Sequence, residues 1–300
     1  MRARPRPWKV PISGRVREII FPGLQAVQES RGAHQERHMN NILDLDRYPV
    51  DKEGSQAWHA MVAQAVAELD TQGMFNLEGF VRPDAVQKLV AHIKPVMDTQ
   101  SYTHKRLHNI YFQPEIPGLE AQHPALRKVE TINHTLCADQ ISDSMVMSIY
   151  QYPPFARFLA ATMGKAQLHV MQDPLAAVNV MAYRAGEALN WHFDRSEFTT
   201  TLLLQAPEIG GEFEYRSELR SANDPNYAGV AELLEGRDPQ VKRIRLQAGT
   251  LNVFRGKNTA HRVTTVKGAV DRFIAVFSYY EKPGVMFSDA ERLGFYGRAA

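Results

Sequence analysis

The spacing of apolar residues divides this chain into a mainly helical part and a later part built from short strands. From residue 54 to about residue 170, apolar positions mostly recur at three- and four-residue intervals. Ser55 is a suitable N-cap for a first helix, and Pro83 begins a second one. Residues 154–163 predict a further helix, and residues 73–81 a short strand and turn. We therefore expect a helical layer ahead of the strands.

After residue 170 the pattern changes to short β-rich segments separated by turns that contain glycine. Such a series of short strands predicts an antiparallel sandwich or barrel. A polar insertion at residues 217–240, with Leu233 and Leu234 as an apolar anchor, is expected to form a partly helical excursion over one mouth of the barrel. The predicted strands are residues 177–183, 189–192, 198–204, 212–215, 243–246, 251–254, 261–266 and 272–280.

Composition and charge argue against several classes of protein. The chain has 300 residues, a net charge of +2 and 23 % charged residues, so nothing global indicates binding to nucleic acid or to an anionic membrane. No apolar run approaches the roughly 20 residues that a membrane span needs. The single cysteine, Cys137, cannot form a disulfide within the chain, which fits a reducing cytoplasm. We expect a soluble cytoplasmic protein, and the sequence does not predict its oligomeric state.

Residues 1–38 differ from the rest, because they carry many arginines and four prolines and have no apolar periodicity. Three interpretations stay open for this segment: a disordered basic arm, a transit-like leader, or a mis-assigned start with true initiation at Met39. Residues 39–300 are expected to form a single domain, with a helical part over about 54–170 and a β core over about 175–281.

Two histidines and one aspartate carry the candidate chemistry. His192 and Asp194 lie two positions apart at the end of a predicted strand, so both side chains should point to the same face. His261 begins a later strand. Two histidines and one carboxylate in this order are typical of the facial triad that binds Fe(II) in non-heme oxygenases and leaves the opposite face of the metal open. We predict an iron centre at these three residues.

Arg272 follows His261 by eleven positions and begins the next predicted strand. A guanidinium group matches a carboxylate with two hydrogen bonds, so Arg272 is suited to the far carboxylate of 2-oxoglutarate. We expect the strands that begin at His261 and Arg272 to be antiparallel neighbours joined by the turn at residues 267–271. On the second of these strands, alternation places Ile274, Val276, Ser278 and Tyr280 on the same face as Arg272.

Other motifs and residue clusters give weaker evidence of function. The chain has no glycine-rich phosphate loop after a strand, no Cys-x-x-Cys pair and no Gly-x-Ser-x-Gly elbow. His104 and His108 would lie on one face of a helix, where exposed histidines are more often ordinary surface residues than metal ligands. Cys137 has no activating base beside it and is expected to be a small buried residue.

The segments around the triad resemble the Fe(II)/2-oxoglutarate-dependent dioxygenase superfamily. The resemblance covers roughly residues 40–281 and is concentrated after residue 175. In detail, the residue pattern of these segments is similar to that of the bacterial branch that contains the free-amino-acid halogenases and their hydroxylating relatives. The segments that carry it are Asn-Val-Met-Ala-Tyr-Arg-Ala-Gly at 179–186, Leu-Asn-Trp-His-Phe-Asp at 189–194, Gly-Thr-Leu-Asn-Val-Phe-Arg-Gly at 249–256 and His-Arg-Val at 261–263.

This resemblance implies an α+β fold with a mainly β core, a double-stranded β-helix of the jelly-roll or cupin-like kind with an N-terminal helical buttress. It implies Fe(II) at His192, Asp194 and His261, with 2-oxoglutarate held by Arg272 and O₂ as the oxidant. Tyr183 occupies a position where relatives place a polar residue against the co-substrate. Halogenases of this branch have Gly or Ala where Asp194 stands, which leaves room for chloride. Asp194 therefore predicts hydroxylation of an unactivated C–H bond.

The substrate is expected to be a small molecule, an amino acid or a derivative of one. Arg195 and Glu197 could read the carboxylate and the ammonium of an amino acid, or they could form an ordinary surface ion pair. Two other functions stay open: a protein or peptide hydroxylase, which would need an open groove, and a non-catalytic metal-binding sensory module on the same fold. The residues expected around the pocket mouth are Asn190, Trp191, Arg195, Glu197 and Ser278.

Overall fold

The computed structural model describes residues 37–299, so residues 1–36 of the segment expected to form an N-terminal arm lie outside it. The described helices begin where the sequence provides caps. The Ser55 hydroxyl accepts a hydrogen bond from the Trp58 amide at 3.1 Å, and Gly73 ends the same helix in the left-handed conformation. Residues 37–42 are also helical. The helices after them are α2 (Gln56–Gln72), α3 (Pro83–Gln100), α4 (Met145–Tyr150), α5 (Pro153–Thr162), α6 (Tyr227–Leu234) and α7 (Asp289–Tyr296), with 3-10 turns at Pro124–Leu126 and Ala138–Ile141.

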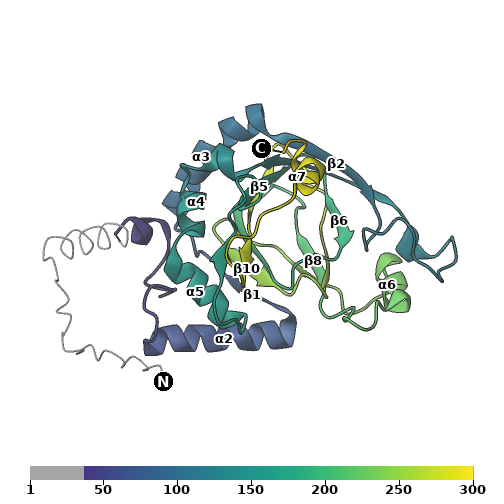
Figure 1. Ribbon diagram of the computed structural model, residues 1–300, viewed down its shortest axis with the longest axis horizontal. Coiled ribbons are helices and arrows are strands. Elements are labelled where there is room, and N and C mark those ends of the chain that lie inside the picture. Colours follow the sequence, from purple (N-terminus) through teal and green to yellow (C-terminus); the bar gives the residue numbers. More distant parts are fainter. Residues whose placement is uncertain (1–36, 300) are drawn as a thin grey trace, which may run out of the picture. The chain divides into compact units, whose positions relative to one another are not determined.

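Two antiparallel sheets form the core of the domain (Figure 1). The larger sheet has the order β1 (Met74–Leu77), β10 (Leu251–Phe254), β7 (Thr199–Gln205), β12 (Arg272–Phe277), β5 (Val178–Tyr183), β3 (Val129–Leu136) and β2 (Tyr102–His108). The smaller sheet has the order β6 (Leu189–His192), β11 (Ala260–Val263), β8 (Phe213–Arg216) and β9 (Lys242–Ile244). A short pair, β4 (His169–Val170) and β13 (Tyr279–Tyr280), lies apart from them.

Core strands alternate between the two sheets along the chain. Strands β5, β7, β10 and β12 belong to the larger sheet, and β6, β8 and β11 belong to the smaller one. This alternation is the double-stranded β-helix that the resemblance implied, and it confirms the expected fold class.

The larger sheet buries both of its faces. Phe273, Ala275 and Phe277 of β12 point into the main hydrophobic core, which they share with residues of α2 to α5. Ile274 of the same strand points to the opposite face, where it packs with Tyr183. Residues on alternate positions therefore belong to a helix-facing layer and to the lumen between the sheets.

Strands β2 and β3 correct the expectation that the segment up to residue 170 is mostly helical. They pair along their whole length and extend the larger sheet beyond β5. His104 and His108 consequently lie on a strand and not on a helix. The alternating residues of β2 contain few apolar side chains, so the segment has no hydrophobic period of its own and becomes a strand only by pairing with β3.

The expected pairing of the strands that begin near His261 and Arg272 is also wrong. Strand β11 pairs with β6 and β8, whereas β12 pairs with β5 and β7 in the other sheet. The chain crosses between the sheets over residues 264–271, because successive strands of a double-stranded β-helix change sheet. Arg272 therefore lies in the sheet opposite the one that carries His261.

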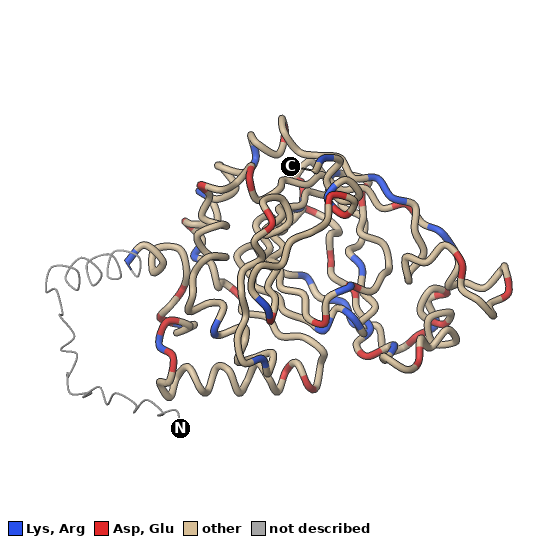
Figure 2. Tube along the Cα trace, in the orientation of Figure 1, with Lys and Arg blue, Asp and Glu red and all other residues tan. Residues whose placement is uncertain are grey.

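Charged residues are interspersed in sign along the described part of the chain (Figure 2). Within residues 37–299, no helix combines the length and the apolar character that a membrane crossing needs.

Candidate metal centre

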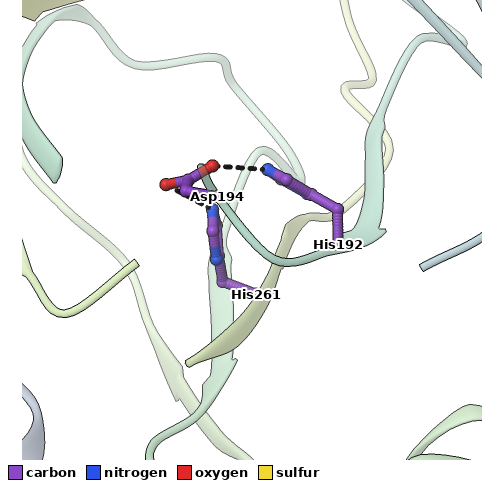
Figure 3. Close-up of side chains that lie close together, drawn as sticks. All are labelled: His192, Asp194 and His261. Carbon is purple, nitrogen blue, oxygen red and sulfur yellow. Dashed lines mark ion pairs between the residues drawn. The ribbon is translucent and has the colours of Figure 1, made fainter. Parts of the chain in front are cut away.

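His192, Asp194 and His261 converge at one end of the smaller sheet (Figure 3). His192 is the last residue of β6, and the antiparallel register places His261 of β11 directly opposite it. One donor atom from each of the three residues lies within 4.8 Å of the other two. Nε2 of His192 is 3.3 Å from Asp194 Oδ1, and Nε2 of His261 is 3.4 Å from Asp194 Oδ2. The two nitrogens and the carboxylate are thus close enough to share one ion.

Backbone carbonyls fix the orientation of both imidazoles. Nδ1 of His192 lies 2.8 Å from the Asn190 carbonyl oxygen, and Nδ1 of His261 lies 3.0 Å from that of Thr259. A carbonyl can only accept, so each Nδ1 carries the proton and donates it. Each Nε2 then keeps its lone pair, and both lone pairs are directed toward Asp194. This pattern is typical of histidines that bind a metal.

Asp194 is held in its ionised form. Its backbone amide donates to the Gly256 carbonyl at 3.0 Å, and the Thr199 hydroxyl donates to Oδ2 at 2.5 Å. Burial alone would raise the pKa of this carboxyl, but its interactions with His261 and His192 and the hydrogen bond from Thr199 hold the pKa well below its usual value. The carboxylate therefore offers a negative charge to a cation at neutral pH.

Gly256 leaves room for that carboxylate. A Cβ atom at this position would lie 2.5 Å from Asp194 Oδ2 and 2.9 Å from Asp194 Cβ, and it would also collide with the Thr199 hydroxyl. Any larger residue would displace the Asp194 carboxylate or the Thr199 hydroxyl that donates to it. The glycine is required for space, since its backbone does not adopt the left-handed conformation.

Aromatic rings surround the two imidazoles and keep water away from them. Phe254 and Phe213 lie 4.7 Å and 5.7 Å from the His261 ring, measured between centroids, and Phe112 lies 5.9 Å from the His192 ring. Burial lowers the pKa of His261 to about 4, although Asp194 opposes the shift. His261 is accordingly neutral at physiological pH, which is the state that binds metals.

Phe112 reaches the site through a strained turn that the sequence does not indicate. Its φ of 55° is in the left-handed region, which costs a non-glycine residue about 1–2 kcal/mol. Asn109 holds the turn, because its side-chain oxygen accepts from the amides of Tyr111 and Gln113 at 3.2 Å and 3.1 Å. The turn places the Phe112 ring between His192 and His108.

Arg272 and Tyr183 lie on the lumen side of the larger sheet. The Arg272 side chain is buried, and within residues 37–299 it makes one hydrogen bond, to the Gly211 carbonyl at 3.2 Å, and no ion pair. Tyr183 is its direct cross-strand neighbour, and the charge of Asp194 also acts on the Tyr183 hydroxyl. A buried guanidinium without an acidic partner fits an anionic ligand, because leaving such a charge unpaired is costly.

The residues expected at the pocket mouth are dispersed. Asn190 contributes the carbonyl that orients His192, while its side chain donates to the Glu130 carbonyl at 2.6 Å. Strand alternation turns Trp191 away from His192, and the Arg262 guanidinium covers the Trp191 ring at 4.9 Å. Ser278 follows β12, and its carbonyl accepts from the Tyr150 hydroxyl at 2.7 Å.

Arg195 and Glu197 do not pair with each other. Arg195 forms an ion pair with Glu291 of α7 at 3.0 Å. Glu197 forms one with Lys165 at 2.7 Å, and the two line a cavity of about 190 Å³ together with Glu281.

Thr199, Gly256 and Phe112 are site residues that the sequence pattern did not indicate. Thr199 is close enough in sequence to Asp194 for a local search to find it, five positions further on. The other two come into place only through strand pairing and the folding of distant loops.

Comparisons with known proteins found one matching family and several solved structures with a similar fold. The family model described as Halogenase D matches residues 57–286. The chain is similar to the non-heme alpha ketoglutarate dependent carbocyclase SnoK from nogalamycin biosynthesis, with 14 % identity, a TM-score of 0.50, and coverage of 77 % of this chain and 90 % of that one. No curated protein sequence matches.

Two further solved structures are similar. The epimerase SnoN in complex with Fe³⁺, alpha ketoglutarate and nogalamycin RO matches with 13 % identity and a TM-score of 0.50, over 74 % of this chain and 84 % of that one. A 2OG-Fe(II) oxygenase-family oxidoreductase from Burkholderia pseudomallei matches with 15 % identity and a TM-score of 0.46, over 78 % and 94 %. At these identities the likeness concerns the fold alone.

Proposed function

Because the chain belongs to the halogenase D family, we propose that it is an Fe(II)- and 2-oxoglutarate-dependent oxygenase of the cytoplasm. Its reaction would be hydroxylation of an unactivated C–H bond of a small molecule, an amino acid or a derivative of one. The observation that carries this proposal is the convergence of two imidazole nitrogens and one carboxylate, with donor atoms within 4.8 Å of one another. That donor set is the one preferred by non-heme Fe(II) in oxygenases.

Different residues of the chain would bind the metal and orient its ligands. His192, Asp194 and His261 would hold the metal, and the carbonyls of Asn190 and Thr259 keep both histidines in the required tautomer. Iron bound there would supply the activation of O₂, with 2-oxoglutarate as the co-substrate.

Arg272 would hold the distal carboxylate of 2-oxoglutarate in the lumen, with the Tyr183 hydroxyl beside it. The aromatic rings around His261 and His192 exclude water, which strengthens the electrostatic interactions of the bound groups.

Asp194 favours hydroxylation over halogenation. A carboxylate at this position fills the space that a halide ligand would need, and its hydrogen bonds to Thr199 and Gly256 hold it there. The family model takes its description from halogenases, so this residue supports a hydroxylating member of the family.

Packing between two excursions beside the metal site supports a small substrate. The excursion between β2 and β3 packs against α6 in one apolar cluster that includes Tyr111, Val230 and Leu233. The Tyr111 hydroxyl also donates to the Pro225 carbonyl at 2.5 Å. The same cluster includes Phe193 and Ala260, the chain neighbours of His192 and His261, so the two excursions pack together beside the metal site. A protein or peptide substrate would need an open groove there.

Cys137 has no part in the proposed chemistry. It is buried, and burial raises the pKa of its thiol to about 11, so the thiol stays protonated and unreactive.

The proposal is tested by product mass. Purified protein, Fe(II), 2-oxoglutarate and saturating chloride are incubated with a panel of free amino acids, and succinate release identifies an accepted one. We expect a product heavier than the substrate by one oxygen atom. A chlorinated major product would contradict the role given to Asp194. Absence of succinate release with any amino acid, despite binding of Fe(II) and 2-oxoglutarate, would contradict the substrate class.

A further inference from the structure

A polar wall continues the lumen beyond Arg272 and Tyr183. The register of β3 against β5 places Thr135 opposite Met181, so Thr135 and Asn133 share the face of Tyr183. The register of β2 against β3 then brings Arg106, opposite Thr131, onto that face. The inner face of β2 and β3 is consequently polar, although it adjoins a buried site.

Arg106 is the only arginine of this wall. Within residues 37–299 it forms neither an ion pair nor a hydrogen bond, while its neighbour Lys105 points to the other face and pairs with Glu130 at 2.9 Å. The Arg106 side chain is partly buried, and this desolvation lowers the pKa of its guanidinium. A cation that loses water without gaining an acidic partner is suited to an anionic ligand.

Phe112 connects Arg106 to the metal site. The guanidinium carbon of Arg106 lies 4.4 Å from the centroid of the Phe112 ring, and the edge of the same ring meets His192. One aromatic ring thus separates the cation from a candidate metal ligand. A substrate anchored at Arg106 would extend along this ring toward the metal.

Asn133 provides a second, independent observation. Its side chain is 6 % exposed, and its Oδ1 atom is buried without a hydrogen-bond partner. The amide nitrogen of the same side chain is 3.5 Å from the Thr135 hydroxyl. His104, directly opposite on β2, and Tyr183 also interact with this side chain, but neither lies within hydrogen-bonding distance of Oδ1. Because buried polar atoms in folded proteins are nearly always paired, Oδ1 is suited to accept from a ligand that donates an N–H or O–H.

We propose that Arg106 docks the acidic group of the primary substrate, a carboxylate or a phosphate, and that Asn133 Oδ1 accepts a hydrogen bond from the same molecule. This inference rests on the proposed function and deepens it: the substrate is an anion that carries a second polar donor. Two arginines would then bind two anionic molecules: Arg272 the co-substrate and Arg106 the substrate.

Arg220 is another arginine near the site, but it does not belong to the wall of β2 and β3. Its Nε donates to the Lys257 carbonyl at 2.7 Å, and its guanidinium lies 4.0 Å over the Phe193 ring. The charge of Asp194 also acts on this guanidinium, so Arg220 has an acidic neighbour within the protein that Arg106 lacks.

The experiment uses the full-length protein loaded with Fe(II) and 2-oxoglutarate without O₂, whose visible charge-transfer band responds to a molecule that binds beside the metal. The probes are the common L-amino acids, their amides, which lack the α-carboxylate, and a set of phosphate monoesters. We expect acidic probes, and not the amides, to perturb the band. Phosphate monoesters acting alone would identify phosphate as the acidic group, and carboxylates acting alone would identify the carboxylate.

Variants separate this inference from the proposed function. Arg106→Gln should weaken binding of the acidic probe on the order of tenfold or more and leave 2-oxoglutarate affinity unchanged. Arg106→Lys, which keeps the charge, should retain part of the binding. Asn133→Leu should also weaken binding of the acidic probe. Arg127→Gln, which removes an exposed arginine between β2 and β3, should leave binding of the probe unchanged.

Perturbation by an amide as strong as by its acid would overturn the inference, as would a wild-type protein that holds 2-oxoglutarate but responds to no acidic probe. Equal probe affinity in wild type and Arg106→Gln would also overturn it. Failure of Fe(II) and 2-oxoglutarate to give the band at all would instead count against the proposed function.

Discussion

Arg272 and Tyr183 lie directly opposite each other on the antiparallel strands β12 and β5, and both side chains are buried. Burial lowers the pKa of Arg272 to about 10 and raises that of Tyr183 to about 12. At neutral pH the pair therefore presents a cation and a neutral hydroxyl to the lumen. These are the groups that a buried carboxylate needs.

Replacing Arg272 with Ala should weaken 2-oxoglutarate binding by about 2–5 kcal/mol, because a buried carboxylate would lose its cation. Titration of the Fe(II)-loaded protein with 2-oxoglutarate measures the effect. The matched control is Arg245→Ala, which removes an exposed arginine whose side chain reaches only the Glu208 carbonyl. Equal affinity in the Arg272 variant and the control would refute the assignment.

The close approach of Gly256 to Asp194 gives a second prediction. Gly256→Ala should weaken Fe(II) binding on the order of tenfold or more, and it should lower the free energy of unfolding by about 1–3 kcal/mol, as overpacking does. Calorimetric titration with Mn(II) under air, or Fe(II) without O₂, measures the affinity.

Gly294→Ala is the matched control for Gly256→Ala. A Cβ atom at Gly294 would meet nothing within 4 Å, and its backbone is helical. This variant should bind metal as the wild type does. If both alanine variants bound metal equally well, the space beside Asp194 would not be required.

Asp173 ties the C-terminal helix α7 to the core. It is buried and accepts hydrogen bonds from the amides of Leu175, Ala176 and Phe287 and from Arg292 Nε, at 2.8–2.9 Å. Asp173→Asn should lower the free energy of unfolding by about 3 kcal/mol, since Arg292 would lose its buried partner. Urea unfolding at neutral pH checks this value.

The same carboxylate predicts how stability changes with pH. Burial alone would raise the pKa of Asp173, but its three amide hydrogen bonds and Arg292 lower it. A depressed pKa in the folded state contributes stability above the unfolded value of about 3.9, and that contribution is lost as pH falls through the folded pKa. Below about pH 4, the wild type should therefore lose its advantage over Asp173→Asn. A constant difference between the two at all pH values would contradict this explanation.

The metal centre could be predicted from the sequence because its residues are either close together in the chain or follow one another in a characteristic order. Two-residue alternation puts His192 and Asp194 on one face. Arg272 begins a strand, as the pattern indicated, and His261 is the second residue of one. The topology could not be predicted with the same success. Apolar spacing does not specify which sheet a strand joins, so β11 and β12 were expected to be neighbours although they lie in opposite sheets.

The remaining parts of the site depend on contacts that are distant in sequence. Strand β2 has no apolar period and depends on β3 for its conformation. Phe112 reaches His192 through a left-handed turn stabilised by Asn109, and such a turn has no reliable signature in a non-glycine residue. The requirement for glycine at position 256 arises from Asp194 and Thr199, which approach it only after β7 and β10 have paired.

The central claim is that His192, Asp194 and His261 hold iron beside a 2-oxoglutarate site at Arg272. An anaerobic titration of the full-length protein with Fe(II) and 2-oxoglutarate, followed by visible absorption, tests it most directly. We expect a charge-transfer band that saturates at one iron per chain. The band should be abolished by His261→Ala and unchanged by His92→Ala, which removes an exposed histidine. A protein that gives no band, or one whose band survives His261→Ala, would contradict the claim.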